Sequence, residues 1–256
     1  QRAHRLRRNR DVKRRLISCA EHFNKSPKKG LAYMQEIGLL PDPLEANTVA
    51  RFFKHAPGLD KETLGEYLGD PKDFMVEVLK EYCATFDFHG VTLDKALRSF
   101  LDGFKLPGEA QKISRILEVF AARYHEANPG AVADADSAYV LSYSIIMLNT
   151  DLHNVAISPK ISLRQYVASC HRCVPLRHVP EAYLGRVYLS VLRAPLRRWP
   201  ESDSRLLSRE NQRANGTWLC GIFTRRTIFP VCTSHSRRSD RKSTRLNSSH
   251  QIISYA

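Results

Sequence analysis

Residues 138–154 read AYVLSYSIIMLNTDLHN, a stretch that is apolar on almost every side when it is wound as a helix. A helix that is apolar all round is typical of the buried centre of a helical protein. Its polar residues gather at the end, where Asn149, Asp151, His153 and Asn154 follow the apolar run. We therefore expect a central buried helix whose carboxyl end reaches a polar surface.

The segments on both sides of this stretch also follow a helical period. Apolar residues recur at intervals of three and four, with almost none of the alternation that marks strands. The expected helices span residues 11–23, 27–37, 43–55, 60–69, 73–86, 92–103, 109–124, 136–147, 162–170 and 179–192. The sequence predicts an all-α fold with a single domain at residues 10–196, preceded by a basic segment at residues 1–9.

Beyond residue 196 the chain loses its helical period. Residues 197–239 are rich in Arg and Ser and show no pattern that predicts an element. Residues 240–256 begin DRKSTRLNSSH and end ISYA, which resembles the translation of a sequencing adapter. Segments of that kind are excluded from reasoning about fold. We therefore expect residues 197–256 to be a non-native or unstructured tail.

The formal net charge of +14 is concentrated at the two ends of the chain. Residues 1–15 hold eight basic and one acidic residue (+7), residues 16–196 hold 20 and 21 (−1), and residues 197–256 hold 12 and four (+8). Nucleic-acid binding requires cations organised on a folded surface. The pattern therefore favours solvated ends and no nucleic-acid partner, with an acidic membrane surface as the second interpretation of the amino-terminal run.

No apolar run approaches the ~20 residues of a membrane-spanning helix, and the arginine-rich start lacks the apolar core of a signal peptide, so we expect a cytoplasmic protein. Cys19 and Cys83 lie in apolar helical patterns, which is typical of buried thiols in a reducing compartment. Cys170 and Cys173 have the spacing of half a zinc site, with His178 as a conceivable third ligand. Structural zinc needs four ligands. We favour two thiols on one helical turn and expect no metal.

A second stretch, FKLPGEAQKI at residues 104–113, places Glu109 directly behind a Pro-Gly break. The break ends one helix and leaves Glu109 in the first turn of the next. A carboxylate there complements the positive end of the helix dipole and contributes up to ~1 kcal/mol. Alternatively, the rigid corner projects the carboxylate into a site on another molecule. Residue type alone favours the first interpretation.

The motifs of covalent catalysis are missing from the sequence. It has no P-loop, no GxGxxG after a strand, no HExxH and no nucleophile elbow. The paired carboxylates Asp134 and Asp136 lie at a helix start, where acids favour the dipole. We therefore expect no cofactor and look to surfaces: a groove floored by Tyr143, Ile146 and Met147 would suit capture of an apolar loop of a partner.

Together the two stretches resemble the paired signature of the Sec7 (Sec-seven) domain, the guanine-nucleotide exchange domain of Arf GTPase activators. The resemblance covers roughly residues 10–196 and includes GEYLG at 65–69, FDF at 86–88, ALR at 96–98 and FAARY at 120–124. It implies about ten helices in a right-handed superhelix, with a hydrophobic groove between the two motifs. It also implies a large, brefeldin-sensitive exchange factor that other parts of its parent protein recruit to Golgi or endosomal membranes.

The resemblance further implies catalysis of exchange without covalent chemistry. Glu109 matches the family's glutamate finger, which enters the nucleotide site of an Arf-family GTPase near the β-phosphate and Mg²⁺ and releases GDP. The implied partner is the GDP-bound and then nucleotide-free GTPase. A non-catalytic helical scaffold that binds a partner through the same groove is the alternative. The residues predicted to bind the GTPase are Tyr139, Tyr143, Ser144, Met147, Asn149, Asp151 and Asn154.

Some positions depart from the family pattern. Ser114 stands where many members carry Asp, and VAISPK at residues 155–160 replaces a proline and a lysine-rich turn. Tyr143, Ser144 and Asp151 match the brefeldin-sensitive members. Ile161, by contrast, stands where those members carry Met. The sequence predicts sensitivity to brefeldin A and less electrostatic help from the loop after Asn154.

Overall fold

The computed structural model describes residues 2–196, and their side chains from residue 10 onward. This part of the chain forms ten α-helices and one short 3₁₀ helix, and it contains no strand. The elements are α1 (Arg2–Lys25), α2 (Pro27–Glu36), α3 (Ala46–His55), α4 (Lys61–Leu68), α5 (Asp73–Ala84), α6 (Leu93–Leu101), α7 (Ala110–Ala127), α8 (Ala135–His153), α9 (Leu163–Arg172), η1 (Val174–Leu176) and α10 (Glu181–Arg193). The predicted all-α class and number of helices are confirmed.

The first helix begins earlier in the chain than the sequence predicted. Residues 2–9 were expected to precede the first helix. In the structure α1 begins at Arg2, so these residues form its first turns. The predictions for residues 197–256 lie outside the described residues.

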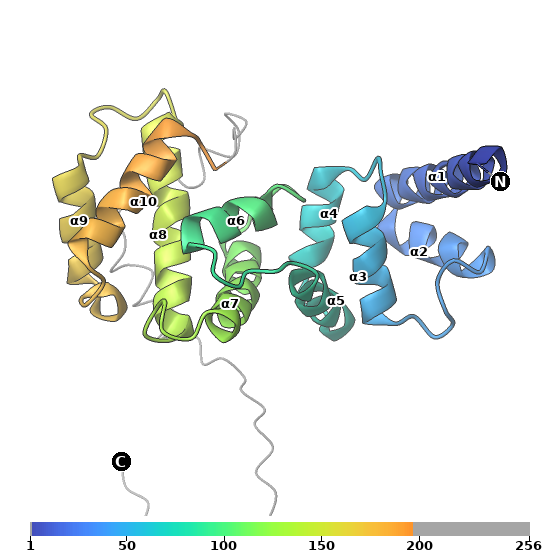
Figure 1. The fold of residues 1–256 in the computed structure, drawn as a ribbon, viewed down its shortest axis with the longest axis horizontal. Helices are drawn as coiled ribbons and strands as arrows, with labels where there is room; N and C mark the ends of the chain where they lie inside the picture. The colour runs from blue at the N-terminus through green and yellow to red at the C-terminus, as the bar shows by residue number, and fades with distance from the viewer. Residues whose placement is uncertain (1, 197–256) are drawn as a thin grey trace, which may run out of the picture.

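The helices follow one another along an elongated array (Figure 1). α1 and α2 form one end, α3 to α5 come next, and α8, α9 and α10 form the other end. α8 packs against α7 on one side and α10 on another. Residues 137–151 of α8 are consequently all buried, which confirms the central helix that the apolar stretch predicted.

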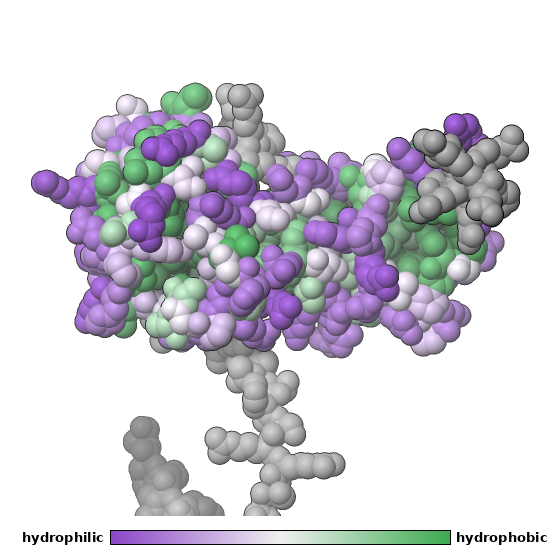
Figure 2. Space-filling model, viewed as in Figure 1, coloured by the Kyte–Doolittle hydropathy of each residue, from purple (hydrophilic) through white to green (hydrophobic). Residues whose placement is uncertain are grey.

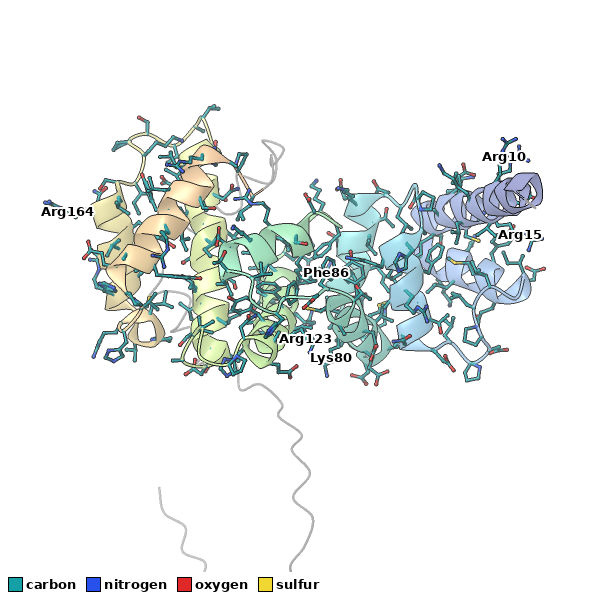
Figure 3. All side chains as sticks on the ribbon, viewed as in Figure 1. Arg10, Arg15, Lys80, Phe86, Arg123 and Arg164 are labelled. Carbon is teal, nitrogen blue, oxygen red and sulfur yellow. The ribbon has the colours of Figure 1, made fainter. Side chains whose placement is uncertain are left out.

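A cluster of aromatic rings fills the middle of the array, where Figure 3 shows Phe86. The ring of Phe100 on α6 lies 5.5 Å from that of Phe86, 5.2 Å from that of Phe104 and 5.3 Å from that of Phe120, centroid to centroid. Tyr82 of α5 joins the same cluster through Phe86 at 5.4 Å. These edge-to-face and stacked contacts tie α5, α6 and α7 together. They also anchor Phe104, the first residue of the FKLPGEAQKI stretch.

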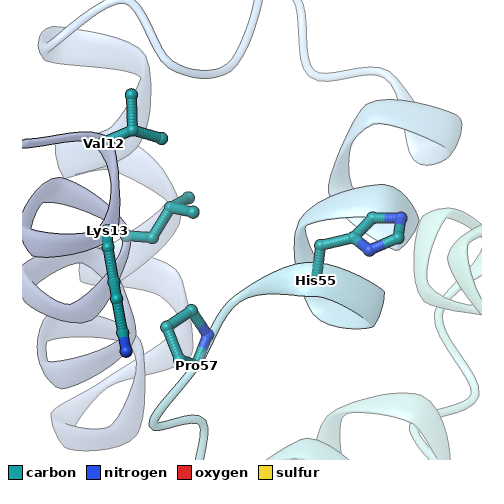
Figure 4. Close-up of a pocket in the computed structure, with 5 residues that line it drawn as sticks. Val12, Lys13, His55 and Pro57 are labelled. Carbon is teal, nitrogen blue, oxygen red and sulfur yellow. The ribbon is translucent and has the colours of Figure 1, made fainter. Parts of the chain in front are cut away.

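The surface is mostly hydrophilic in the view of Figure 2, with hydrophobic patches at both ends of the array. A pocket of 380 Å³ lies at the α1 end, between α1 and the segment after α3 (Figure 4). Figure 1 places α1 and α8 in different parts of the array, so this pocket is separate from the two motifs. The pocket is lined by Val12, Lys13, Leu16, His55 and Pro57.

Within residues 2–196 no helix is both long and apolar enough to cross a membrane.

The start of α8 is fixed by a side-chain cap. One carboxylate oxygen of Asp134 accepts a hydrogen bond from the backbone N–H of Ser137 at 2.6 Å. That hydrogen bond is the main cause that lowers the pKa of Asp134 from its ordinary value. A carboxyl group whose pKa is lower in the folded state stabilises the fold above its unfolded pKa, and this stabilisation is lost as the pH falls through the folded pKa.

Replacing Asp134 by Ala should therefore lower the free energy of unfolding by about 1 kcal/mol at neutral pH. The difference between the variant and the wild type should shrink once the pH falls below the ordinary carboxyl range, because the wild-type cap is then protonated. Urea unfolding of both proteins at neutral and at acid pH measures this. A difference that stays constant across the titration would show that the carboxylate charge contributes nothing to the cap.

Candidate functional site

The corner between α6 and α7 is anchored by apolar side chains and exposes one carboxylate. Phe104 and Leu106 are buried in the core. Glu109 has extended backbone angles (φ −98°, ψ 126°) and lies one residue before the first residue of α7, not in its first turn as predicted. Its side chain makes no capping hydrogen bond and is 67% exposed. The corner therefore presents Glu109 to the solvent, and end-capping of α7 does not account for this residue.

The corner lies against α4. The backbone N–H of Lys105 donates to the carbonyl of Lys61 at 2.8 Å, and the Lys61 ammonium donates to the carbonyl of Asp102 at 2.6 Å. A methyl group added at Gly65 would lie 1.7 Å from the carbonyl oxygen of Lys105. Only glycine leaves room for so close an approach between a helix and the backbone of a segment that crosses it. α4 is therefore the support on which the corner rests.

Lys112 connects α4 to Glu109. Its ammonium nitrogen lies 2.6 Å from a carboxylate oxygen of Glu66 and 2.9 Å from one of Glu109. The hydrogen bonds to Glu66 and then to Glu109 raise the pKa of Lys112 above its ordinary value. The side chain of Lys112 is only 19% exposed because it packs beside Gly69.

The two motifs meet where α7 packs against α8. The hydroxyl groups of Ser114 and Tyr139 are hydrogen-bonded at 2.9 Å, so Ser114 supplies a neutral contact between α7 and α8. Tyr139, Tyr143 and Met147 expose 4%, 5% and 2% of their area. Ile146, the third residue of the predicted groove floor with Tyr143 and Met147, is fully buried. These side chains offer little open surface in this conformation, and both the groove floor and the contact through Tyr139 stay predictions.

Two of the predicted contact residues lie in the interior. Ser144 is fully buried, donates to the carbonyl of Leu141 at 2.8 Å and lies 3.2 Å from the hydroxyl of Tyr166 on α9. Asn149 is also fully buried, and its side-chain oxygen accepts from the backbone N–H of Leu196 at 2.8 Å. A partner cannot touch either residue in this conformation. Their side chains instead join α8 to other parts of the fold, Ser144 to α9 and Asn149 to the backbone of Leu196.

The carboxyl end of α8 is closed by a loop. A carboxylate oxygen of Asp151 accepts from the backbone N–H of Ile161 at 2.8 Å, and burial raises the pKa of Asp151. The ammonium of Lys160 donates to the carbonyl of Asp151 at 2.7 Å and also to the carbonyl of Asn154. The lysine therefore binds backbone carbonyls at the end of the helix. The expectation that this loop gives a partner less electrostatic help stays a prediction. Asn154 itself is half-buried, and its side-chain oxygen accepts from the N–H of Ala156 at 2.9 Å.

The cysteines of the described residues are reduced and buried, as predicted for Cys19 and Cys83. Cys170 lies in the last turn of α9, which ends at Arg172, and Cys173 is the next residue, so the two thiols lie three residues apart across the end of the helix. Burial raises the pKa of Cys83 and of Cys170 to about 12, which keeps both thiols protonated and poor as metal ligands. Across the part of the chain that the structure describes, no three His, Cys, Asp or Glu side chains come together in a group that could hold a metal ion.

These features define an all-helical domain in which a corner before α7, packed against α4, presents the carboxylate of Glu109 to the solvent. Comparison with known proteins gives its family. The sequence model of the Sec7 domain matches residues 12–196, and the chain belongs to the Sec7 domain family.

The chain is similar to known exchange factors and to solved Sec7 domains. It is 45% identical over 199 residues to the ARF guanine-nucleotide exchange factor GNOM of Arabidopsis thaliana, covering 78% of this chain and 14% of that protein. It is 46% identical over 168 residues to the human brefeldin A-inhibited guanine nucleotide-exchange protein 1, covering 65% and 9%. A structure of ARF1-GDP bound to a Sec7 domain complexed with brefeldin A matches with a TM-score of 0.67 at 38% identity, over 74% of this chain and 95% of that one. The chain thus spans about a seventh or less of the length of these curated relatives.

Sequence reasoning missed the support of Glu109. GEYLG at residues 65–69 contributed to the family resemblance, but neither Gly65 nor Glu66 was predicted to belong to the site. A signal was present, because one glycine inside a short helix (Gly65) and another directly after it (Gly69) indicate a place that another segment approaches closely.

Proposed function

We propose that this domain is a guanine-nucleotide exchange factor that releases GDP from an Arf-family small GTPase by inserting Glu109 near the β-phosphate and the Mg²⁺ site. The observation that carries the proposal is the exposed carboxylate of Glu109 on a corner fixed by the core and by α4. The relatives, which are named as an exchange factor for ARF and as a brefeldin A-inhibited exchange protein, support the choice of partner.

The proposed mechanism is electrostatic. A small GTPase holds GDP through contacts to its phosphates and through Mg²⁺. A carboxylate at about 4 Å from the β-phosphate costs about 4 kcal/mol in a partly desolvated site, where the effective dielectric constant is near 20. Glu109 also competes for the cation that binds the phosphate and disfavours the metal. Because ~1.4 kcal/mol corresponds to a tenfold change in rate, this repulsion accelerates GDP release by about two to three orders of magnitude.

The surface beside the corner has the chemistry to bind the switch regions of such a partner. Tyr139, Tyr143 and Met147 form the proposed apolar floor, and their small exposed area means that the partner must open the surface of α8 as it docks. Asp151 and Asn154 form the proposed polar rim at the end of the helix. For Ser144 and Asn149 the burial in the structure favours a role in positioning α8.

The release of fluorescent GDP from an Arf-type GTPase tests the proposed function. The chain should accelerate release in proportion to its concentration at physiological Mg²⁺. The alternative, a scaffold that binds through the same surface without catalysis, predicts binding with no acceleration. Measuring binding to the nucleotide-free GTPase in parallel separates a scaffold from a chain that does not recognise this partner.

Brefeldin A should slow this release. Tyr143, Ser144 and Asp151 match the pattern of sensitive members, whereas Ile161 does not, so we expect partial inhibition that increases with drug concentration. The GDP-release assay with and without the drug measures it. A release rate that does not respond to brefeldin A would mean that Ile161 outweighs the other three positions.

The site of action in the cell belongs to the same proposal. We infer action at Golgi or endosomal membranes, with recruitment by other parts of a longer parent protein. The part of the inference that concerns a longer parent protein is supported by the relatives, because the matched region is only 14% and 9% of their lengths. The choice of membrane rests on the family resemblance alone.

A further inference from the structure

We propose that Lys112 is a positioning residue for Glu109 and that Glu66 of α4 holds Lys112 in place. The proposal rests on the proposed function, since it concerns how Glu109 is presented for exchange. It starts from one ammonium group shared by two carboxylates, Glu66 at 2.6 Å and Glu109 at 2.9 Å.

The two carboxylates differ in how firmly each is attached to the fold. Glu66 belongs to α4, whose neighbouring Gly65 lies against the backbone of the corner. Glu109 stands outside the helix, with a side chain that is 67% exposed and has several rotamers open to it. The side chain of Glu66 is 47% exposed, but its backbone is held in α4. The lysine therefore links the more exposed carboxylate, which stands outside the helices, to one that is carried by a helix.

The stem of Lys112 is itself fixed by packing. A methyl group added at Gly69 would lie 2.9 Å from the β-carbon of Lys112, so the glycine leaves room for the lysine against the end of α4. Arg115, three residues further along α7, donates to the carbonyl of Gly69. Two cations on one face of α7 thus hold the end of α4, and one of them reaches on to Glu109.

This arrangement sets the direction of the Glu109 carboxylate before a partner arrives. When the partner draws Glu109 into its nucleotide site, Lys112 stays with Glu66 and does not follow the carboxylate. Without Lys112 the side chain of Glu109 would spread over several rotamers, and only a fraction of encounters would place it correctly. Misplacing a reacting group by about 1 Å can cost as much as 100-fold in rate.

The test is the maximal rate of GDP release at saturating concentrations of the chain. Lys112→Met should lower the maximal rate by about tenfold while the concentration for half-maximal rate changes little. Lys112→Arg should restore most of the rate, since a guanidinium also pairs with two carboxylates. Glu66→Gln should have a smaller effect of about threefold, because an amide oxygen remains as acceptor. Lys72→Met, which removes a lysine from an exposed ion pair with Asp70 that does not involve Glu109, should leave the rate unchanged.

A second background separates positioning from simple stability. In Glu109→Gln no carboxylate needs to be placed, so adding Lys112→Met should not lower the residual rate further. An equal fall in both backgrounds, a Lys112→Met rate equal to that of the wild type, or no rescue by Lys112→Arg would overturn the proposal. If the proposed function itself is wrong, the wild-type chain will release no GDP and no variant will differ from it.

Discussion

Glu109→Lys should lower the rate of GDP release by at least about 100-fold while the domain stays folded. The substitution replaces the group that repels the β-phosphate by one that attracts it, so the proposed driving force changes sign. It also sets two ammonium groups against each other at the corner, because Lys112 lies 2.9 Å from the present carboxylate. The fold should tolerate the change, since the side chain is largely exposed and caps no helix.

The same helix supplies a matched control. Glu126 lies at the other end of α7, is 67% exposed like Glu109, and forms an ion pair with Arg123 at a spacing of three residues. Exposed ion pairs of this kind contribute little to stability, about 0–1 kcal/mol. Glu126→Lys should therefore change the release rate by less than about twofold. Comparable losses in both variants would point to the net charge of the domain and away from the corner.

Gly65→Ala should be the most destabilising of the single changes considered. The added methyl group would lie 1.7 Å from the carbonyl oxygen and 2.9 Å from the carbonyl carbon of Lys105, and backbone on both sides leaves no flexible group to give way. Forcing atoms into a close-packed contact of this kind costs about 1–3 kcal/mol or more. We expect the free energy of unfolding to fall by about 3 kcal/mol, and the folded fraction to release GDP slowly because the corner has moved.

Gly185→Ala is the control for this prediction. Gly185 lies inside α10, and no heavy atom lies within 4 Å of an added methyl group. Alanine in a helix interior is more favourable than glycine by about 0.5–1 kcal/mol, so this variant should be slightly more stable than the wild type. Denaturant unfolding of both variants measures the contrast. Equal stabilities for Gly65→Ala and the wild type would show that α4 and the corner are not in close contact.

Much of the fold could be predicted from the sequence because its signals are local. Apolar spacing located the helices, and the stretch that is apolar all round identified α8 as the buried centre. Helix ends were less certain, since α1 begins at Arg2 and α3 begins at Ala46, three residues after the expected start. Basic residues at the start of the chain carry no marker that separates a solvated segment from the first turns of a helix.

The candidate site was only partly predictable because its support is not local. The Pro-Gly break indicated a corner at Glu109, and the structure has this corner, with the Glu109 side chain 67% exposed. The contact between Lys105 and Gly65 joins residues 40 positions apart, and no periodic pattern records it. The burial of Ser144 and Asn149 likewise depends on α9 and on Leu196, which reach α8 only in the folded chain.

The charge of Glu109 is the central claim, and Glu109→Gln isolates it from the shape of the side chain. The decisive measurement is the maximal rate of GDP release from an Arf-type GTPase at saturating wild-type or Glu109→Gln chain. The account predicts a fall of at least about 100-fold in that rate, with little change in the concentration needed to reach half of it, because the amide fits the same space without repelling the phosphate. A Glu109→Gln chain that releases GDP within about threefold of the wild-type rate would contradict the account.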